Sequence, residues 1–114
     1  MQHALVTGGT GFIGQHLVRK LVGSGIKTTA LVRPSSDISP LLGLGEDVQI
    51  FEFDQSFESI KRCFNENSFD AVFHLATHFV ADHDPKQIDE LVKSNVTFGM
   101  KVAEAAASHK VENF

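Results

Sequence analysis

The hydrophobic pattern of the chain switches repeatedly between short apolar runs and longer segments with helical spacing. Each apolar run has about the length of one strand, and the gaps between them hold glycine, proline and serine. Because parallel strands are joined by helices, this alternation predicts an α/β fold with a parallel sheet and right-handed crossovers. The predicted strands are residues 3–7, 28–32, 48–53 and 70–75, the last of them fully buried.

Three helices are predicted between and after these strands. The first ends at the stop signal Gly23-Ser24-Gly25, and the last begins where Asp84 can cap a helix with Pro85 at its first position. Residues 35–46 are expected to form a loop with one helical turn, because serine, proline and glycine recur there. The predicted helices are residues 12–23, 57–64 (entered through Ser56) and about 85–108.

The most informative stretch is the turn between the first strand and the first helix. Gly9, Gly11 and Gly14 fit the spacing G-x-G-x-x-G, and Gly8, Gly11 and Gly14 fit G-x-x-G-x-x-G. Glycine lets the strand turn sharply and brings the backbone close to phosphate, while the helix directs free N–H groups and its dipole at the anion. We therefore expect pyrophosphate binding here, with a ligand-free glycine turn as the alternative.

Composition and charge limit the classes of function. The 114 residues support one domain, 1–114, and a hydrophobic content of 42% is enough to bury a core. A net charge of -4 disfavours nucleic acid or an anionic membrane as a partner. The lone Cys63 excludes an internal disulfide and fits a reducing compartment. With no signal-like or membrane-spanning stretch, a cytoplasmic protein is expected.

Taken together, the motifs give the chain a resemblance to the extended short-chain dehydrogenases/reductases, the NAD(P)-dependent epimerase/dehydratase family. The resemblance implies a Rossmann-type doubly wound parallel sheet with strand order 3-2-1-4, truncated after the fourth strand and its following helix. It places a dinucleotide across the carboxyl ends of the strands, at the switch between strands 1 and 4. The motifs that carry it, in family order, are Thr7–Gly14, Phe53-Asp54-Gln55, Phe73–Thr77, and Asn95–Gly99 followed by Glu104-Ala105-Ala106.

The resemblance also implies cofactor contacts, residue by residue. Asp54 would accept a hydrogen bond from the adenine amino group, with Gln55 alongside, and Asn95 would anchor the long helix near the cofactor. The alternatives are that Asp54 is a turn residue capping the next helix and that Asn95 is a buried amide satisfying helix–helix contacts. The pyrophosphate would lie on Gly8, Gly11, Phe12, Ile13 and Gly14, and the nicotinamide ribose near Leu75, Ala76 and Thr77.

The choice of cofactor depends on the end of the second strand. An NAD-preferring site places a carboxylate there for the ribose 2′-hydroxyl, about 20 residues past the glycines. In this chain that place falls at Val32, followed by Arg33 and Ser36, and no Asp or Glu occurs between Gly14 and Asp37. Arginine with nearby hydroxyls suits a 2′-phosphate, so NADP(H) is expected. The alternative is that Arg33 stacks on adenine in a site that takes NAD(H).

In one respect the chain departs from the family pattern, because it contains no tyrosine. The family transfers hydride with the help of a Tyr-x-x-x-Lys pair, so no catalytic residue is assigned within residues 1–114. We expect the dinucleotide-binding portion of a longer nucleotide-sugar reductase, epimerase or dehydratase, cut before a fifth strand. The alternative is a stand-alone module that binds or senses NAD(P) without turning it over.

The histidines that follow the fourth strand are expected to shape a substrate entrance rather than to bind a metal ion. His74 and His78 stand four residues apart, but His74 lies in a predicted strand, so no metal site is expected. His78, Phe79 and His83 are expected to shape the substrate entrance. The run 74–79 resembles that of the deoxysugar 4-ketoreductases that complete CDP-linked 3,6-dideoxyhexoses.

Self-association is expected at two surfaces. The fourth strand would be a sheet edge with unpaired N–H and C=O groups, a surface that pairs readily with another chain. The resemblance implies dimer contacts along the long helix, so we expect a homodimer through residues 88–106.

Overall fold

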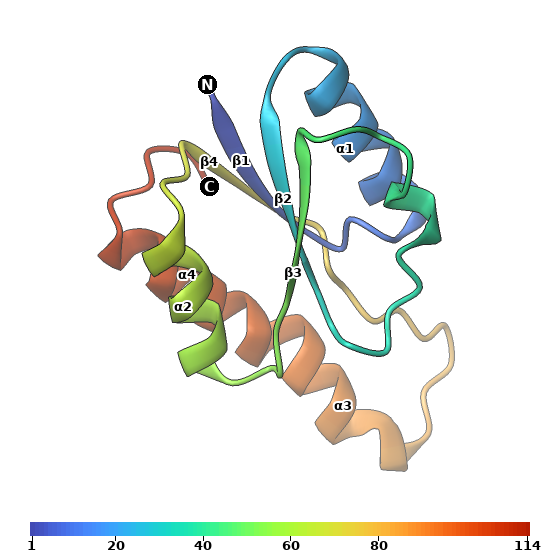
Figure 1. Cartoon of the computed structure of the whole chain (residues 1–114). Helices are drawn as coiled ribbons and strands as arrows, with labels where there is room; N and C mark the ends of the chain where they lie inside the picture. Colours follow the sequence, from blue (N-terminus) through green and yellow to red (C-terminus); the bar gives the residue numbers. More distant parts are fainter.

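Four parallel strands form one sheet in the order β3-β2-β1-β4, as the resemblance implied (Figure 1). The computed structural model describes residues 1–114. The order places β1 between β2 and β4, so the chain reverses its direction of sheet growth after β3. The strands are β1 (His3–Thr7), β2 (Lys27–Val32), β3 (Val48–Glu52) and β4 (Ala71–His74). The Rossmann-type fold expected from the sequence is thereby confirmed.

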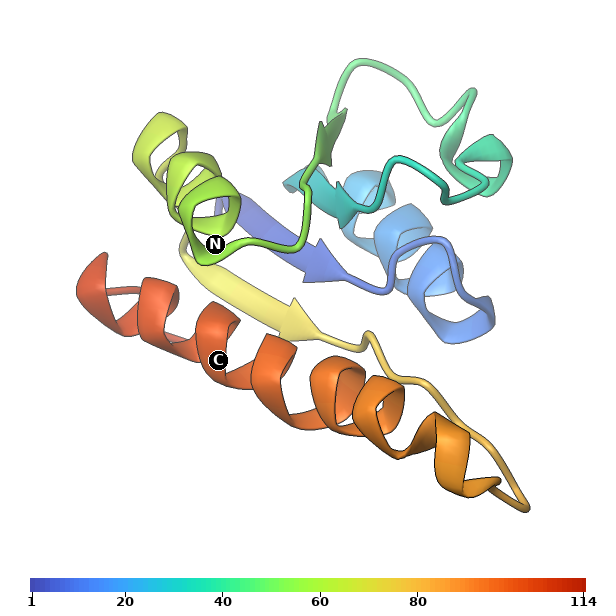
Figure 2. The same ribbon diagram turned by 90° about the horizontal axis from the view of Figure 1, so that it is seen from below.

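Helices cover both faces of this sheet (Figures 1 and 2). On one face lies α1 (Phe12–Gly23), and on the other lie α2 (Phe57–Glu66) and α4 (Phe98–Ser108). The predicted cap of α2 is confirmed, because Ser56 Oγ accepts a hydrogen bond from the Ser59 amide at 3.1 Å. The helical turn expected within 35–46 is the 3₁₀ turn η1 (Ser39–Leu41). None of the helices combines the length and apolar character that crossing a membrane requires.

The alternation of side chains along each strand divides the core into two layers. Leu5 and Val72 point toward α2 and α4, where they pack with Phe64 and Val102. The intervening positions of the strands point toward α1. There the core consists of Ala4, Val6, Ala30, Val32, Val18, Leu21 and Leu41.

The predicted long helix is present but is not a regular α-helix throughout. It begins with the 3₁₀ turn η2 (Pro85–Gln87), where Asp84 and Gln87 form a capping box, and continues as α3 (Ile88–Val92). A π-helical turn, η3 (Lys93–Thr97), connects α3 to α4. Such turns insert a residue into the helix and are frequent at functional sites.

The β4 edge differs from the prediction in two ways. Phe73 and His74 are only partly buried, so β4 is not the fully buried strand that was expected. In addition, the edge is not wholly unpaired, because the Val72 amide donates to the Asn113 carbonyl at 2.9 Å and Ala71 bridges Asn113 in parallel. The chain after α4 thus returns to the sheet and pairs beside β4.

Candidate functional site

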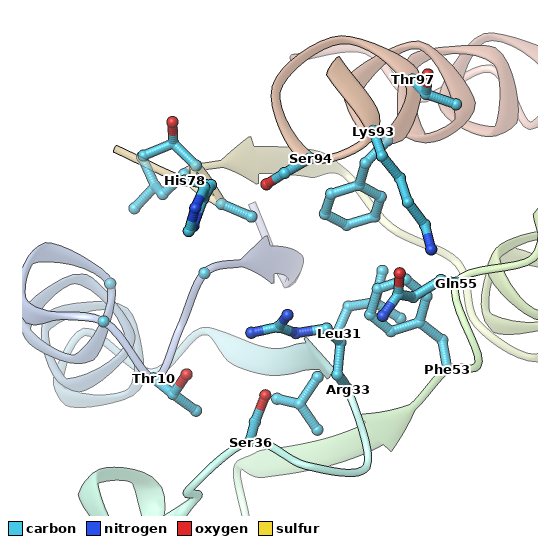
Figure 3. Close-up of a pocket in the computed structure, with 18 of the residues that line it drawn as sticks. Thr10, Leu31, Arg33, Ser36, Phe53, Gln55, His78, Lys93, Ser94 and Thr97 are labelled. Carbon is cyan, nitrogen blue, oxygen red and sulfur yellow. The ribbon is translucent and has the colours of Figure 1, made fainter. Parts of the chain in front are cut away.

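A cleft of about 840 Å³ lies at the carboxyl ends of the strands (Figure 3). One wall is formed by the glycine turn and the ends of β2 and β3, and the other by α3, η3 and the start of α4. All but two of the predicted cofactor residues line this cleft; the exceptions are Asp54 and Asn95. Those that line it are Gly8, Gly11, Phe12, Ile13, Gly14, Arg33, Ser36, Gln55, Leu75, Ala76 and Thr77.

Steric limits at the glycine turn explain why two of its glycines are required. A Cβ on Gly14 would lie 1.9 Å from the carbonyl oxygen of Gly8, which no rearrangement of a side chain could relieve. Gly8 itself has φ +72°, and a Cβ there would lie 2.7 Å from the backbone nitrogen of Ala76. The turn therefore packs against both the start of α1 and the segment that follows β4.

The first turn of α1 leaves backbone donors available to a ligand. Gly11 is the N-cap residue and supplies no side-chain cap. Within the chain, the amides of Phe12 and Ile13 form no hydrogen bond, whereas the Gly11 amide donates to the Gly8 carbonyl at 3.1 Å. Unpaired N–H groups at the positive end of a helix dipole form an anion-binding site.

Cationic side chains reach the other end of the cleft from both walls. Arg33 and Ser36 extend from the segment after β2, and Lys93 and Ser94 face them from the long helix (Figure 3). Lys101 of α4 also lines the cleft, and its Nζ donates to the Gln55 carbonyl at 3.2 Å. Arg33, Lys93 and Lys101 therefore outnumber the carboxylates that line the cleft, which are Asp89 and Glu90.

Sequence reasoning missed the residues of this second wall. The sequence does contain a signal for this wall. Polar side chains recur at helical spacing between residues 93 and 101, on a different face of the helix from its apolar side chains. The missed residues include Lys93, Ser94, Thr97, Phe98 and Lys101 from the long helix, and Thr10 from the glycine turn.

Asp54 is held in a turn at the start of α2. Its Oδ1 accepts hydrogen bonds from the backbone amide and the hydroxyl of Ser56, the N-cap residue of that helix. These hydrogen bonds, with the Ser56 hydroxyl contributing most, lower the pKa of Asp54 to about 2. The arrangement is the one expected of a turn residue that precedes a helix, and the adenine contact stays a prediction.

Asn95 holds the segment that follows β4 from outside the cleft. Its Oδ1 accepts from the His78 amide at 2.7 Å and from the Thr77 hydroxyl at 3.1 Å, and its Nδ2 donates to the His78 carbonyl at 2.8 Å. Asn95 is exposed and lies in the π-helical turn, so the alternative of a buried amide between helices is wrong. Through these bonds the long helix positions Thr77 and His78, both of which line the cleft.

His74 is hydrogen-bonded to the neighbouring strand β1 and lies between the sheet and α4. Its Nδ1 lies 2.8 Å from Thr7 Oγ1, and burial lowers its pKa below the ordinary value of 6.5. Of the residues predicted to shape a substrate entrance, His78 lines the cleft, whereas Phe79 and His83 are exposed outside its lining. No three His, Cys, Asp or Glu side chains gather closely enough to hold a metal ion.

Comparison with known proteins gives the geometry a context. A family model described as "NAD dependent epimerase/dehydratase family" matches residues 4–114. The chain is 33% identical over 113 residues to UDP-glucose 4-epimerase of Neisseria meningitidis serogroup A, an alignment that covers 94% of this chain and 33% of that relative. It is 31% identical over 110 residues to CDP-abequose synthase of Salmonella muenchen, covering 96% and 35% respectively. The chain thus spans about a third of the length of these curated relatives.

Solved structures show the same fold. The crystal structure of UDP-glucose 4-epimerase from Thermus thermophilus, determined in complex with NAD, superposes with a TM-score of 0.84 at 27% sequence identity. The superposition covers 97% of this chain and 35% of that one. The region matched by the family model, residues 4–114, includes every residue that lines the cleft.

Proposed function

This chain belongs to the NAD-dependent epimerase/dehydratase family, and we propose that it forms the dinucleotide-binding portion of an enzyme that modifies nucleotide sugars. The observation that carries the proposal is the glycine turn. A Cβ at Gly14 would collide with the Gly8 carbonyl at 1.9 Å, and the amides of Phe12 and Ile13 have no partner in the chain. This combination of close backbone approach and free N–H groups suits a pyrophosphate.

We further propose that NADP(H) is bound in preference to NAD(H). Arg33 and Ser36 line the cleft at the end of β2, where an NAD-preferring site holds a carboxylate. A guanidinium binds a 2′-phosphate bidentately, and Lys93 on the opposite wall adds positive potential. The Thermus relative was crystallised with NAD, so this preference is a point on which the two proteins would differ.

The reaction proposed is hydride transfer to or from a sugar carbon of a nucleotide sugar. When bound, the dinucleotide supplies the hydride donor or acceptor. The glycine turn binds its phosphates, Leu75, Ala76 and Thr77 border the path toward the nicotinamide ribose, and Asn95 orients Thr77 and His78. The family's catalytic tyrosine is absent from the sequence, so the acid–base group is proposed to lie outside residues 1–114. The similarity to both a 4-epimerase and a CDP-abequose synthase supports a nucleotide sugar as substrate.

A homodimer through the long helix completes the proposal. Ile88, Val92, Val96 and Met100 recur every four residues, and each has about half or more of its surface exposed. An exposed apolar stripe at this spacing is suited to packing against the same stripe of a second copy. A monomer in light scattering at roughly 100 µM would contradict this part of the proposal, since a biological helix interface holds at far lower concentration.

Titration of the chain with NADPH and NADH tests the function directly. We expect NADPH to bind more tightly, and Gly11→Ala to weaken both dinucleotides at least tenfold, because its methyl group would occupy phosphate space. A Cβ at Gly11 meets only the Gly8 carbonyl oxygen, at 3.4 Å, so this variant is expected to fold. The matched control is Gly23→Ala, whose Cβ meets nothing within 4 Å. If wild type bound neither dinucleotide, the proposal would fail.

The same titration bears on the alternative of a binding or sensing module without enzymatic activity. The reading frame that encodes the chain distinguishes the portion of an enzyme from the sensing module. A Tyr-x-x-x-Lys sequence encoded a few dozen residues beyond Phe114 supports the enzyme. A stop codon directly after Phe114, together with tight NADPH binding, supports the sensing module.

A further inference from the structure

One hydroxyl group joins β1 to the segment that follows β4. Thr7 is fully buried, and its Oγ1 lies 3.2 Å from the amide nitrogens of both Leu75 and Ala76. The same oxygen lies 2.8 Å from Nδ1 of His74. The Leu75 amide also donates to the Thr7 carbonyl at 3.2 Å, whereas the Ala76 amide has no other acceptor in the chain. The position of Ala76 therefore depends on the orientation of a single hydroxyl.

The balance of donors and acceptors determines that orientation. A hydroxyl has one hydrogen and two lone pairs. Two amide N–H groups occupy both lone pairs of Thr7 Oγ1, so its hydrogen must be donated to Nδ1 of His74. Neutral His74 then carries its own hydrogen on Nε2, which faces α4, where a Cβ on Gly99 would lie 3.2 Å from it.

The surroundings of His74 favour this neutral form. Its ring contacts Phe98 of α4 at a centroid distance of 5.3 Å and Phe114 of the C-terminal segment at 6.3 Å. Thr7 faces it from β1 and Gly99 from α4, so none of the side chains that face it is charged or titratable. Desolvation is the cause of the lowered pKa of His74.

We propose that neutral His74 is a positioning residue for dinucleotide binding, acting through the Thr7 hydroxyl to fix Ala76 and Thr77 in the wall of the cleft. The inference rests on the proposed function and concerns how that site is held. Imidazolium would present an N–H donor at Nδ1 as well, so three donors would compete for two lone pairs of Thr7 Oγ1. The imidazolium would occupy one lone pair, so the Leu75 and Ala76 amides would share the other. The Leu75 amide keeps the Thr7 carbonyl, whereas the weakened bond of the Ala76 amide has no second acceptor to replace it. Because Ala76 packs directly against Gly8, its displacement would disturb the phosphate turn.

The dissociation constant of NADPH, measured between about pH 5 and pH 8, tests this coupling in wild type and in variants. We expect wild-type affinity to fall about tenfold on acidification, the cost of one hydrogen bond. In His74→Asn the side-chain oxygen can replace Nδ1 as an acceptor that does not titrate. This variant is expected to bind as tightly as wild type at neutral pH and to lose the part of the pH dependence that His74 causes. Only the dependence from titration of the 2′-phosphate, which is common to every variant, should remain. His74→Leu, which has no acceptor, should bind about tenfold more weakly at every pH.

Thr7 provides an independent pair of variants. Thr7→Ser keeps the hydroxyl and should behave like wild type, whereas Thr7→Val removes it at nearly the same volume and should match His74→Leu. His78→Asn is the control for the other histidine that lines the cleft, and it should retain the wild-type dependence on pH. A His74→Asn variant that kept the wild-type pH profile would overturn the inference. So would wild-type affinity in a folded Thr7→Val variant.

Hydrogen exchange of the Ala76 amide in the ligand-free chain distinguishes failure of this inference from failure of the proposed function. Protection of this amide is expected to decrease about tenfold as His74 is protonated, and to be independent of pH in His74→Asn. That result would support the positioning role even if no dinucleotide bound. Unchanged protection in wild type would overturn it, whatever the chain binds.

Discussion

The two walls of the cleft are built by different kinds of interaction. The glycine turn is fixed by contacts between backbone atoms, and a Cβ at Gly14 would lie 1.9 Å from a carbonyl oxygen. The long-helix wall is held by side chains, with the amide group of Asn95 and the ammonium group of Lys101 each bonded to a different loop. The glycine turn of the first wall tolerates almost no substitution. The long-helix wall, like the Arg33 segment at the end of β2, can change its side chains and keep its shape, so specificity can vary at these two places.

The largest effect is expected from adding one methyl group to the glycine turn. Gly14→Ala is expected to abolish dinucleotide binding and to lower the free energy of unfolding by about 3 kcal/mol, since backbone atoms must move to relieve the collision. Denaturant unfolding followed by circular dichroism measures the loss. Gly23→Ala, at the other end of the same helix, should leave stability and binding within about 0.5 kcal/mol of wild type. Equal effects of the two substitutions would contradict the steric argument.

A substitution at Arg33 tests the selectivity of the site for NADPH over NADH rather than the existence of the site. Arg33→Gln is expected to weaken NADPH binding by about thirtyfold, the loss of a charge-assisted bond to phosphate, and NADH binding by less than about threefold. Fluorescence titration of both nucleotides measures the ratio. Arg19→Gln, an exposed arginine of α1 that does not line this cleft, is the matched control. A uniform loss for both dinucleotides would instead favour stacking of Arg33 on adenine.

The same difference between the walls explains how much could be read from the sequence. The spacing of Gly8, Gly11 and Gly14 predicts the turn, and only glycine fits at Gly8 and Gly14. The flanking strand and helix follow from periodicity. The strand order was an implication of the family resemblance, which the fold confirms. Lys93 and Thr97 were not predicted to line the cleft, because periodicity identifies the buried face of a helix and says little about a polar face.

Other features depended on interactions between segments distant in sequence. The π-helical turn at Lys93–Thr97 has no compositional signal, and the pairing of Asn113 with Val72 depends on the return of the chain to the sheet. For Asp54 the family motif implies an adenine contact, which stays a prediction. The turn in which two donors of Ser56 hold its carboxylate matches the alternative of a turn residue.

Asn95 tests whether the long helix positions the segment that follows β4. Asn95→Ala removes three hydrogen bonds to Thr77 and His78. Because the site is exposed, we expect a loss of about 1 kcal/mol in stability and about tenfold in NADPH affinity. Asn65→Ala removes an exposed amide from α2, where it bonds His109, and should leave affinity unchanged. If Asn95→Ala bound NADPH like wild type, the 75–78 segment would owe its position to the sheet alone.

Among these substitutions, one at Lys101 in the long-helix wall is expected to have the smallest effect. Its ammonium group bonds the carbonyl of Gln55, a non-glycine residue with φ +71°, and so joins α4 to the loop after β3. Lys101→Met keeps the aliphatic stem and removes the donor, which should cost less than about 1 kcal/mol of stability and about threefold in NADPH affinity. Lys101→Arg, which keeps a donor, should recover most of that affinity. A larger loss in Lys101→Met for NADPH than for NADH, not recovered by lowering the salt concentration, would show that Lys101 contacts the phosphate itself rather than holding Gln55.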